Sequence, residues 1–527
     1  MSPEATPAFI RAFFDPSVYS HPVRKVELIE THISWVLLAG EFAYKIKKPV
    51  DFGFLDFSTL DKRRYYCEEE LRLNRRWAPS IYLEVLPITG TPQRPLLGGE
   101  GVPFEYALKM RRFPQEIRLD HLLDRGELGA SHIDLLAKNL AHFHLALPAA
   151  PLDSSYGSPE RVLQPMEENF AQILPLLREN EDKARLEGLR LWSAEEAVRL
   201  RNDLAERKRQ GFIRECHGDL HLGNIVLLDG MPVPFDCIEF NDNLRWIDSI
   251  SDLAFTEMDL LDRKRPDFAY RLLNGWLEHT GDYQGVRLLR LYQVYRAMVR
   301  AKVAALRASQ AGHDAVSLEA VWTEYRGYIS LAEQLSRPCT PLLLITCGLS
   351  GSGKTTLTQP LVEQAGAIRL RSDIERKRLF GLPALAKSGS AVNGGIYSAD
   401  ASQRTYERLL ELARQVIGAG YPVIVDATFL RRSQRDVFHE LASRLNVPFA
   451  ILDFQAAEET LRERIRRRQA ANNDASEADL AVLEKQLANR EPFSASEQPY
   501  VIPVDSELAD ASKGMLSALR RKDLFKQ

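Results

Sequence analysis

Short segments in which apolar and polar residues alternate predict two separate sheets in this chain. Residues 26–47 alternate in this way and contain a turn signal at 39–41, which predicts a hairpin. Further strands of the same sheet are predicted at 82–88 and 104–110. Later in the chain, short apolar segments alternate with amphipathic helical segments, and the predicted strands there are 342–346, 423–425, 450–453 and 500–504. Such alternation predicts a parallel sheet with helices on both faces.

The region between these sheets has the spacing of amphipathic helices. A first helix is predicted over 61–77, because Ser58 and Thr59 can cap its first turn and Pro79 stops it. After residue 131 the apolar residues fall on one helical face, at Ile133, Leu136, Leu140, Phe143 and Leu147. Long helices are also predicted over 285–308 and 315–335. A sheet-rich front followed by a helical back is the layout of a two-lobed kinase.

The segment 336–341 separates the two patterns. It contains Pro338 and Pro341 and interrupts the helical spacing, so we expect a linker there. The sequence therefore predicts an N-terminal, two-lobed, protein-kinase-like α+β domain over 1–335 and an α/β domain with a parallel sheet over 342–527. A chain of 527 residues is too long for one core, which agrees with this division.

Composition and charge are ordinary, with 45% hydrophobic residues, 27% charged residues and a net charge of -3. This charge gives no general attraction to nucleic acid or to anionic membranes. The five cysteines are scattered without a CxxC pair, which favours reduced thiols. The N-terminus lacks a signal-peptide pattern, and no segment approaches the roughly 20 apolar residues of a membrane span. We therefore expect a cytoplasmic protein with no membrane partner.

One motif in the first domain has the residues that phosphoryl transfer requires. The segment 217–224 has the sequence HGDLHLGN, and Asp236 follows a predicted strand over 225–228. Phosphoryl transfer needs a positioned acceptor, neutralised phosphate charge and a metal that bridges the phosphates. Asp219 can accept the hydrogen bond of an attacking hydroxyl group. Asn224 and Asp236 offer the hard oxygen ligands that Mg²⁺ prefers.

The predicted sheet and first helix supply the charges that complete this site. Lys45, on the second strand of the hairpin, can pair with the nucleotide phosphates. A carboxylate on the helix 61–77 would orient this lysine. Glu69 is our first choice and Glu70 the next, because the three consecutive glutamates at 68–70 leave the helical register open.

A zinc site is an alternative interpretation of the same motif. His217, Asp219 and His221 could form a cluster of metal ligands, as in a zinc hydrolase. The magnesium interpretation is favoured, because Asn224 and a distant aspartate suit Mg²⁺ rather than Zn²⁺. We expect His221 to be structural.

The motifs of the first domain resemble those of the aminoglycoside phosphotransferase and choline kinase-like family, over about residues 25–335. The likeness rests on HGDLHLGN, on Phe235-Asp236, and on the segment 248–254, DSISDLA. It implies that Asp219 is the catalytic base, that Asn224 and Asp236 hold magnesium, and that Asp252 braces the catalytic loop. In one departure from the family, no GxGxxG precedes Lys45, so the turn at 30–34 must cover the phosphates with less glycine.

The second domain begins with the most specific motif in the chain, a P-loop. The segment 348–355 has the sequence GLSGSGKT and directly follows the apolar strand 342–346. Glycines let backbone N–H groups close around phosphates, the lysine reaches the β- and γ-phosphates, and the threonine hydroxyl can join the Mg²⁺ shell. A helix that starts there adds the positive end of its dipole. The predicted nucleotide contacts are Gly348, Ser350, Gly351, Ser352, Gly353, Lys354, Thr355 and Thr356.

Later segments of this domain supply candidates for the rest of the reaction. A predicted strand ends at Arg371-Ser372-Asp373, where Asp373 can deprotonate an acceptor hydroxyl group. Asp426, at the end of the strand 423–425, is a candidate ligand for the metal or its water shell. In the basic helix predicted over 461–468, Arg464 and Arg468 lie one turn apart and could close over the transferring phosphate, while the other arginines are expected to be solvated.

From about residue 341 to 510 the order of elements resembles small P-loop kinases of the polynucleotide kinase and zeta-toxin type. This resemblance implies that Asp373 is the acceptor base and that Lys354 and Thr355 contact the nucleotide and magnesium. The order of the whole chain is similar to bacterial proteins described as bifunctional aminoglycoside phosphotransferase/ATP-binding proteins. It implies two modules that use ATP and Mg²⁺, without implying an antibiotic substrate.

Three functional hypotheses follow from the sequence. In the leading one, both modules transfer the γ-phosphate of ATP to a hydroxyl group of a small-molecule or nucleotide-like acceptor. In the second, one module binds ATP without transferring phosphate and regulates the other. In the third, the chain is a nucleic-acid end-processing or toxin-like kinase whose helix 462–468 contacts phosphates, although the net charge does not favour a nucleic-acid partner.

Overall fold

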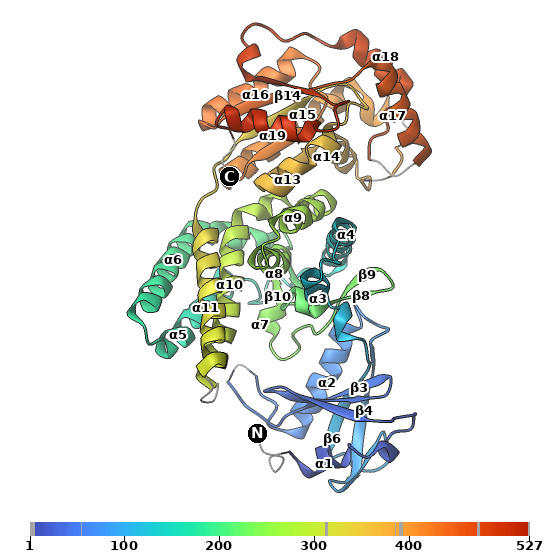
Figure 1. Cartoon of the computed structure of the whole chain (residues 1–527), viewed down its shortest axis with the longest axis vertical. Coiled ribbons are helices and arrows are strands. Elements are labelled where there is room, and N and C mark those ends of the chain that lie inside the picture. Colours follow the sequence, from blue (N-terminus) through green and yellow to red (C-terminus); the bar gives the residue numbers. More distant parts are fainter. Residues whose placement is uncertain are drawn as a thin grey trace. The chain divides into compact units, whose positions relative to one another are not determined.

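The computed structural model describes residues 6–53, 55–310, 315–384, 386–388, 394–471 and 475–524 (Figure 1). These residues pack into two units, each assembled from separate segments of the chain. The first unit contains the residues up to Leu136, together with Leu147–Val162 and Ala205–Thr256. The second contains Ala137–Ala146, Leu163–Leu204 and all residues from Glu257 onward. Both sides of the expected linker 336–341 therefore belong to the second unit.

The first unit contains a six-stranded antiparallel sheet with the order β1-β2-β3-β6-β4-β5. Its strands are β1 (Val26–Glu30), β2 (Ser34–Ala39), β3 (Phe42–Lys47), β4 (Tyr82–Thr91), β5 (Arg94–Leu97) and β6 (Glu105–Arg111). The predicted hairpin is present as β2 and β3. Strand β5 was not predicted, because it lies in the region rich in Gly and Pro that separates β4 from β6.

Alternation along β3 determines which of its side chains reach the site. Tyr44 and Ile46 pack with Trp35 and Leu37 of β2 in the apolar core of the sheet. Because successive side chains of a strand point to opposite faces, Lys45 and Lys47 lie on the other face. Helix α2 (Leu60–Asn74) packs against β4 and β6, and Thr59 caps its first turn by accepting a hydrogen bond from the Lys62 amide.

Two short antiparallel pairs of strands hold the predicted catalytic loop. Strand β7 (Ile213–Glu215) pairs with β10 (Trp246–Asp248), and β8 (Ile225–Leu228) pairs with β9 (Met231–Pro234). The motif HGDLHLGN lies between β7 and β8. The helices of this part of the chain are α3 (Leu119–Asp124), α4 (Ala130–Ala146), α5 (Pro159–Ile173), α6 (Asn180–Arg209), α7 (Asp242–Arg245) and α8 (Ser249–Asp262). The segment 217–224 thus enters from one strand pair and leaves through the other.

The second unit joins long helices to the predicted parallel sheet. Its helices before the sheet include α9 (Pro266–Thr280), α10 (Val286–Gln310) and α11 (Ala315–Ser336), and α10 packs along α11. The sheet has five parallel strands in the order β12-β13-β11-β14-β15. They are β11 (Leu343–Cys347), β12 (Ile368–Arg371), β13 (Val423–Asp426), β14 (Phe449–Gln455) and β15 (Val501–Asp505).

Helices cover this parallel sheet, as the alternation of elements predicts. Val362 of α13 (Gln359–Ala365) and Met515 of α19 (Ala511–Arg521) share an apolar core with Leu344 and Leu452 of the sheet. The remaining helices are α12 (Lys354–Leu357), α14 (Ser372–Leu379), α15 (Ala399–Gly418), α16 (Arg432–Leu445), α17 (Glu458–Ala471) and α18 (Leu480–Asn489). Among the described helices, none is both long enough and apolar enough to cross a bilayer.

Candidate functional sites

The loop 217–224 is held in shape by one buried carboxylate. Asp252 accepts hydrogen bonds from the amides of His217, at 3.1 Å, and of Gly218, at 2.9 Å. Gly218 has φ +87°, and a Cβ atom there would lie 2.6 Å from the Leu244 carbonyl oxygen, so only glycine fits without displacing the backbone. Asp252 therefore holds the loop in the way that the family resemblance implies.

Both histidines of the motif form hydrogen bonds with backbone groups. The His217 ring contacts the Phe235 carbonyl oxygen through Nε2, at 2.8 Å, and accepts from the Asp219 amide through Nδ1, at 3.3 Å. His221 Nδ1 accepts from the Gly223 amide at 3.1 Å. Burial lowers the pKa of His217, although the nearby Asp252 charge opposes this shift. Because both ring nitrogens of His217 already have partners, the zinc interpretation loses one of its ligands.

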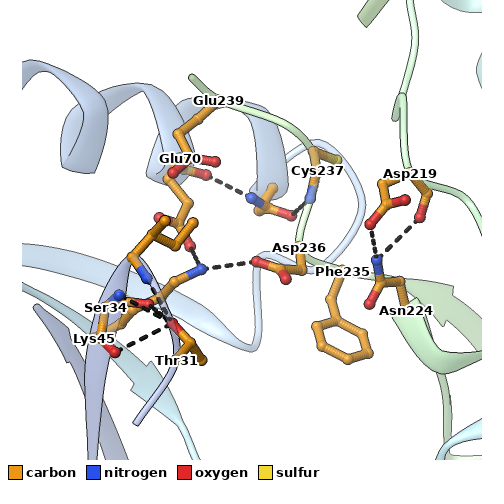
Figure 2. Close-up of polar contacts among 12 residues, drawn as sticks. Thr31, Ser34, Lys45, Glu70, Asp219, Asn224, Phe235, Asp236, Cys237 and Glu239 are labelled. Atoms are coloured by element: carbon orange, nitrogen blue, oxygen red, sulfur yellow. Dashed lines mark hydrogen bonds and ion pairs between the residues drawn. The ribbon is translucent and has the colours of Figure 1, made fainter. Parts of the chain in front are cut away.

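Asp219 and Asn224 form the core of the site. The Asn224 side-chain nitrogen donates to the carbonyl oxygen and to Oδ2 of Asp219, at 3.0 Å each (Figure 2). Because the side-chain nitrogen makes both hydrogen bonds, Oδ1 is the atom of Asn224 that a metal ion would contact. The Asp219 side chain is 35% exposed, so its carboxylate is open to an acceptor from solvent.

Asp236 lies beyond β9 in an uncommon backbone conformation. Its φ of +64° is in the left-handed region, which a residue other than glycine rarely adopts and which is concentrated at functional sites. Hydrogen bonds fix it on both sides. The Asp236 amide donates to the Tyr82 hydroxyl at 3.0 Å, and the next amide, of Cys237, donates to Asn74 Oδ1 at 2.9 Å. The Asp236 carboxylate is thereby directed at Lys45, whose ammonium group lies 2.8 Å away (Figure 2).

The partner of Lys45 on helix α2 is Glu70, and our first choice of Glu69 is wrong. Lys45 donates to Glu70 Oε1 at 2.7 Å. Glu69 instead accepts from Arg72 at 2.8 Å and lies 3.4 Å from Arg245. The buried face of α2 includes Cys67, Glu70 and Leu73, so Glu69 points about 100° away from it.

Lys47 and Glu239 belong to the same charge cluster and were not predicted. Lys47 donates to Glu70 Oε2 at 2.7 Å and also to Glu239. Glu70 is therefore shared by two lysines. Burial alone would raise the Glu70 pKa, but Lys45 and Lys47 outweigh burial and hold it below its ordinary value. Burial also opposes the charge of Lys45, yet Asp236 and Glu70 hold its pKa well above the ordinary value. Lys47 lies two residues after Lys45, and this spacing within a strand predicts that both side chains lie on the same face of the sheet.

The turn between β1 and β2 is closed by hydrogen bonds between Thr31 and Ser34. Thr31 Oγ1 accepts from the Ser34 amide at 2.9 Å, and its hydroxyl also lies 3.0 Å from Ser34 Oγ. Thr31 and Ser34 lie next to Lys45 (Figure 2). Hydroxyl groups and backbone amides can thus face the phosphates there without the three glycines of the usual motif.

The P-loop has the backbone that its sequence predicts. Gly351 and Gly353 have φ of +84° and +80°, and a Cβ atom on Gly351 would lie 2.9 Å from the Leu461 carbonyl oxygen. Lys354 donates to the carbonyl oxygens of Gly348, at 3.0 Å, and Leu349, at 2.8 Å. Its ammonium group therefore lies folded over the loop, and the short helix α12 starts at the same residue.

Thr355 and Asp426 meet at the carboxyl edge of the sheet. The Thr355 hydroxyl donates to Asp426 Oδ2 at 2.6 Å, which places two oxygen ligands of the kind that Mg²⁺ takes beside Lys354. Burial lowers the pKa of Lys354, and the charges of Asp426 and Asp373 only partly offset this effect. The donor set thus fits a magnesium nucleotide, with Lys354 free to exchange its carbonyl partners for phosphate oxygens.

The remaining predicted residues line one cleft of about 1110 Å³ next to the P-loop. Asp373 faces this cleft from the first turn of α14, since β12 ends at Arg371 and the predicted strand was two residues too long. Arg464 donates to the Gly351 carbonyl oxygen at 3.4 Å and to Ser506, and Arg468 donates to the Ala478 carbonyl oxygen at 2.7 Å. The cleft also contains Gln486, which was not predicted and which accepts from the Ser350 amide at 2.7 Å. No sequence pattern marks this glutamine.

Two sequence families match parts of the chain that include the loop 217–224 and the P-loop. The model of the phosphotransferase enzyme family matches residues 94–289, and the model described as an AAA domain matches residues 343–493. The folds and the two sites define an ATP-dependent kinase of tandem architecture, with a kinase-like module followed by a P-loop module.

The chain is similar over most of its length to three mycobacterial proteins. They come from Mycobacterium bovis and from two strains of Mycobacterium tuberculosis, and each is described as an uncharacterized protein. The identity is 32% over 488 residues, which are 90% of this chain and 93% of each relative. The chain belongs to the same family as these bacterial proteins, and in this chain an aminoglycoside phosphotransferase-like domain precedes a P-loop kinase domain.

Solved structures are similar to one or the other part of the chain. An amicoumacin kinase has 12% identity and a TM-score of 0.38, over 59% of this chain and 88% of its own. A choline/ethanolamine kinase family protein from Mesorhizobium loti has 12% identity and a TM-score of 0.36, over 63% of this chain and 98% of its own. A gluconokinase from Sinorhizobium meliloti has 22% identity and a TM-score of 0.26, over 35% of this chain and 94% of its own.

Proposed function

We propose that each module transfers the γ-phosphate of Mg²⁺-ATP to a hydroxyl group of a small-molecule acceptor. One observation carries the proposal: each site combines a lysine held by its surroundings, a pair of oxygen ligands for magnesium, and a further carboxylate. In the kinase-like module these groups are Lys45, Asn224 with Asp236, and Asp219. In the P-loop module they are Lys354, Thr355 with Asp426, and Asp373.

In the kinase-like module, Asp219 accepts the proton of the acceptor hydroxyl as its oxygen attacks the γ-phosphorus. The bond from this phosphorus to the β–γ bridging oxygen breaks, and ADP leaves. The Asn224 amide fixes the rotation of the Asp219 carboxylate, and Lys45, oriented by Glu70, pairs with the nucleotide phosphates. Magnesium held by Asn224 and Asp236 would neutralise charge on the β- and γ-phosphates.

In the P-loop module, Asp373 takes the role of acceptor base and Lys354 binds the β- and γ-phosphates. The amides of the loop 348–353 surround the phosphates, and Arg464 and Arg468 line the same cleft, where positive charge stabilises the transferring group. Thr355 and Asp426 would hold magnesium or its water shell.

The experiment is a transfer assay with ATP labelled at the γ-phosphate and a panel of sugars, amino alcohols, nucleosides and RNA with 5′-hydroxyl ends. We expect Asp219→Asn and Asp373→Asn each to reduce transfer to a different acceptor by at least about 100-fold, because a general base contributes this much. Asp400→Asn, at an exposed position on α15, is the matched control and should behave as wild type. Wild-type transfer by both single variants, to every acceptor that becomes labelled, would refute the proposal.

A further inference from the structure

Helix α9, which belongs to the region matched by the phosphotransferase family, contacts the edge strand of the parallel sheet within the second unit. Strand β12 is an edge strand, so one side of it carries N–H and C=O groups without a strand partner. Asn274 of α9 satisfies two of these groups. Its side-chain nitrogen donates to the Ala367 carbonyl oxygen at 3.1 Å, and its Oδ1 accepts from the Arg369 amide at 2.8 Å. The side-chain amide of Asn274 thus makes the two hydrogen bonds that a neighbouring strand would make at this edge of the sheet.

One turn after Asn274, Glu278 binds two arginines of the same strand. Glu278 Oε1 lies 3.3 Å from Arg369 Nη2, and Oε2 lies 3.4 Å from Arg371 Nη1. The side chains of Glu278 and Arg369 are only 16% and 8% exposed, so water screens this pair weakly. Burial raises the Glu278 pKa, but Arg371 and Arg369 outweigh burial and hold the pKa below its ordinary value. The carboxylate is therefore charged at neutral pH.

Arg369 connects this carboxylate to the P-loop. Its Nη1 donates to the Thr355 carbonyl oxygen at 2.8 Å, within the first turn of α12. Thr355 is the residue whose hydroxyl meets Asp426, so Arg369 touches the backbone of a proposed magnesium ligand. Arg371 lines the acceptor cleft two residues before Asp373. Glu278 thus holds one arginine that reaches the nucleotide site and one that borders the acceptor site.

We infer that Glu278 is a positioning residue for the P-loop module, which acts through Arg369 on Thr355 and through Arg371 on the acceptor side of the cleft. The inference rests on the proposed function, because it concerns the nucleotide site assigned there. It adds that the P-loop module takes part of its site geometry from a helix of the region that precedes it in the chain. Loss of the Glu278 charge releases Arg369, which is then a buried charge without its carboxylate. The Thr355 backbone loses a fixed donor as a result.

The test is nucleotide affinity in the full chain, measured by calorimetry with the magnesium complex of a non-hydrolysable ATP analogue. All variants carry Lys45→Ala, which weakens binding at the kinase-like site. The binding that is lost when Lys354→Ala is added to this parent is the binding at the P-loop. In this background, we expect Glu278→Gln to weaken P-loop binding by about 10-fold, within the usual range of coupling between sites. Glu278→Asp, which retains the charge, should restore part of the affinity.

The matched control is Glu363→Gln, which removes another ion pair between α9 and α13. Glu363 accepts from Arg271 at 2.6 Å and from Gln359 of its own helix at 3.0 Å. We expect this variant to bind within about twofold of its parent, since it disturbs the contact with α9 but not Arg369. Equal affinity of Glu278→Gln and its parent would overturn the inference alone. Absence of any Lys354-dependent binding in the parent would overturn the proposed function and this inference together.

A second measurement needs no change at Glu278 and covers the case in which that variant does not fold. Coupling between two sites is reciprocal, so nucleotide at the P-loop should stabilise the last turns of α9. We expect the analogue to slow hydrogen exchange of the amides of residues 274–281 in the wild-type chain but not in Lys354→Ala. Identical exchange of these amides with and without nucleotide in the wild-type chain would contradict the inference.

Discussion

Glu70 is the residue on which the arrangement of charges in the kinase-like site depends most. It is fully buried and accepts from the ammonium groups of both Lys45 and Lys47, at 2.7 Å each. Glu70 is thus the carboxylate that the two lysines share, while Asp236 pairs with Lys45 alone and Glu239 with Lys47 alone. The same contacts fix the direction in which Lys45 points toward Asp236. Nucleotide binding and local stability are therefore linked at one side chain.

Glu70→Gln should weaken nucleotide binding at this site by about 10-fold and destabilise the first unit by about 3 kcal/mol, because each of the two buried lysines loses one of its two carboxylate partners. The measurement is affinity for the magnesium–analogue complex in a Lys354→Ala background, with thermal unfolding alongside. Glu69→Gln is the control, since Glu69 contacts Arg72 and Arg245 rather than a lysine. A larger loss of affinity in the Glu69 variant than in the Glu70 variant would contradict the assignment.

The sequence contained the information that distinguishes Glu70 from Glu69. Cys67 and Leu73 flank Glu70 at helical spacing, three residues on either side, and all three are buried. Counting the helical period from these two apolar positions would have selected Glu70. The partnership of Lys47 with Glu239 is different, because Glu239 is 192 positions away along the chain. No local pattern relates two residues so distant in sequence.

At the level of elements, helix α8 places the carboxyl group of Glu257 in the interior of the helical part of the second unit. Glu257 is 1% exposed, and its Oε2 oxygen has no hydrogen-bond partner among the described residues. Burial raises the pKa of Glu257 to about 8. Between pH 4.5 and 8 the folded chain therefore keeps a proton that the unfolded chain loses, so stability falls as pH rises through this window.

Glu257→Gln should remove this pH dependence, because an amide of the same shape does not titrate. We expect the variant to be more stable than wild type by about 2–4 kcal/mol near pH 8 and nearly equal to it near pH 5. Thermal unfolding at several pH values measures the difference. Glu319→Gln, whose side chain is 74% exposed, should show no such trend. A stability difference that is the same at both pH values would show that Glu257 is charged when buried.

Most elements that position the sites could be predicted, since strands, caps and loops have local signals. The hairpin β2–β3, helix α2 and the strands of the parallel sheet all lie within a few residues of their predicted positions. The failures have local causes as well. Strand β5 lies among Gly and Pro residues, and Asp373 begins a helix rather than ending a strand because Ser372 starts α14 directly after Arg371. The loop 217–224 was recognisable because its characteristic residues are close together in sequence.

At the scale of the whole molecule, the two nucleotide sites belong to different structural contexts. The kinase-like site is built entirely from residues of the first unit, and the P-loop site from residues of the second. The contact of α9 with β12 could not be predicted, because Asn274 and Glu278 lie more than 90 residues from their partners. The expected division of the chain at 336–341 also gave no reason to look for this contact, because it places α9 and β12 in different domains.

In the proposed function, one chain binds two Mg²⁺-nucleotides, one at each site. The most direct measurement is the binding stoichiometry of the full chain for the magnesium complex of a non-hydrolysable ATP analogue. We predict two bound nucleotides in wild type, one in Lys354→Ala and one in Asp236→Ala, because each substitution removes a ligand of a single site. Binding of one nucleotide or none by the wild-type chain, or a loss of both upon either substitution, would contradict the proposed function.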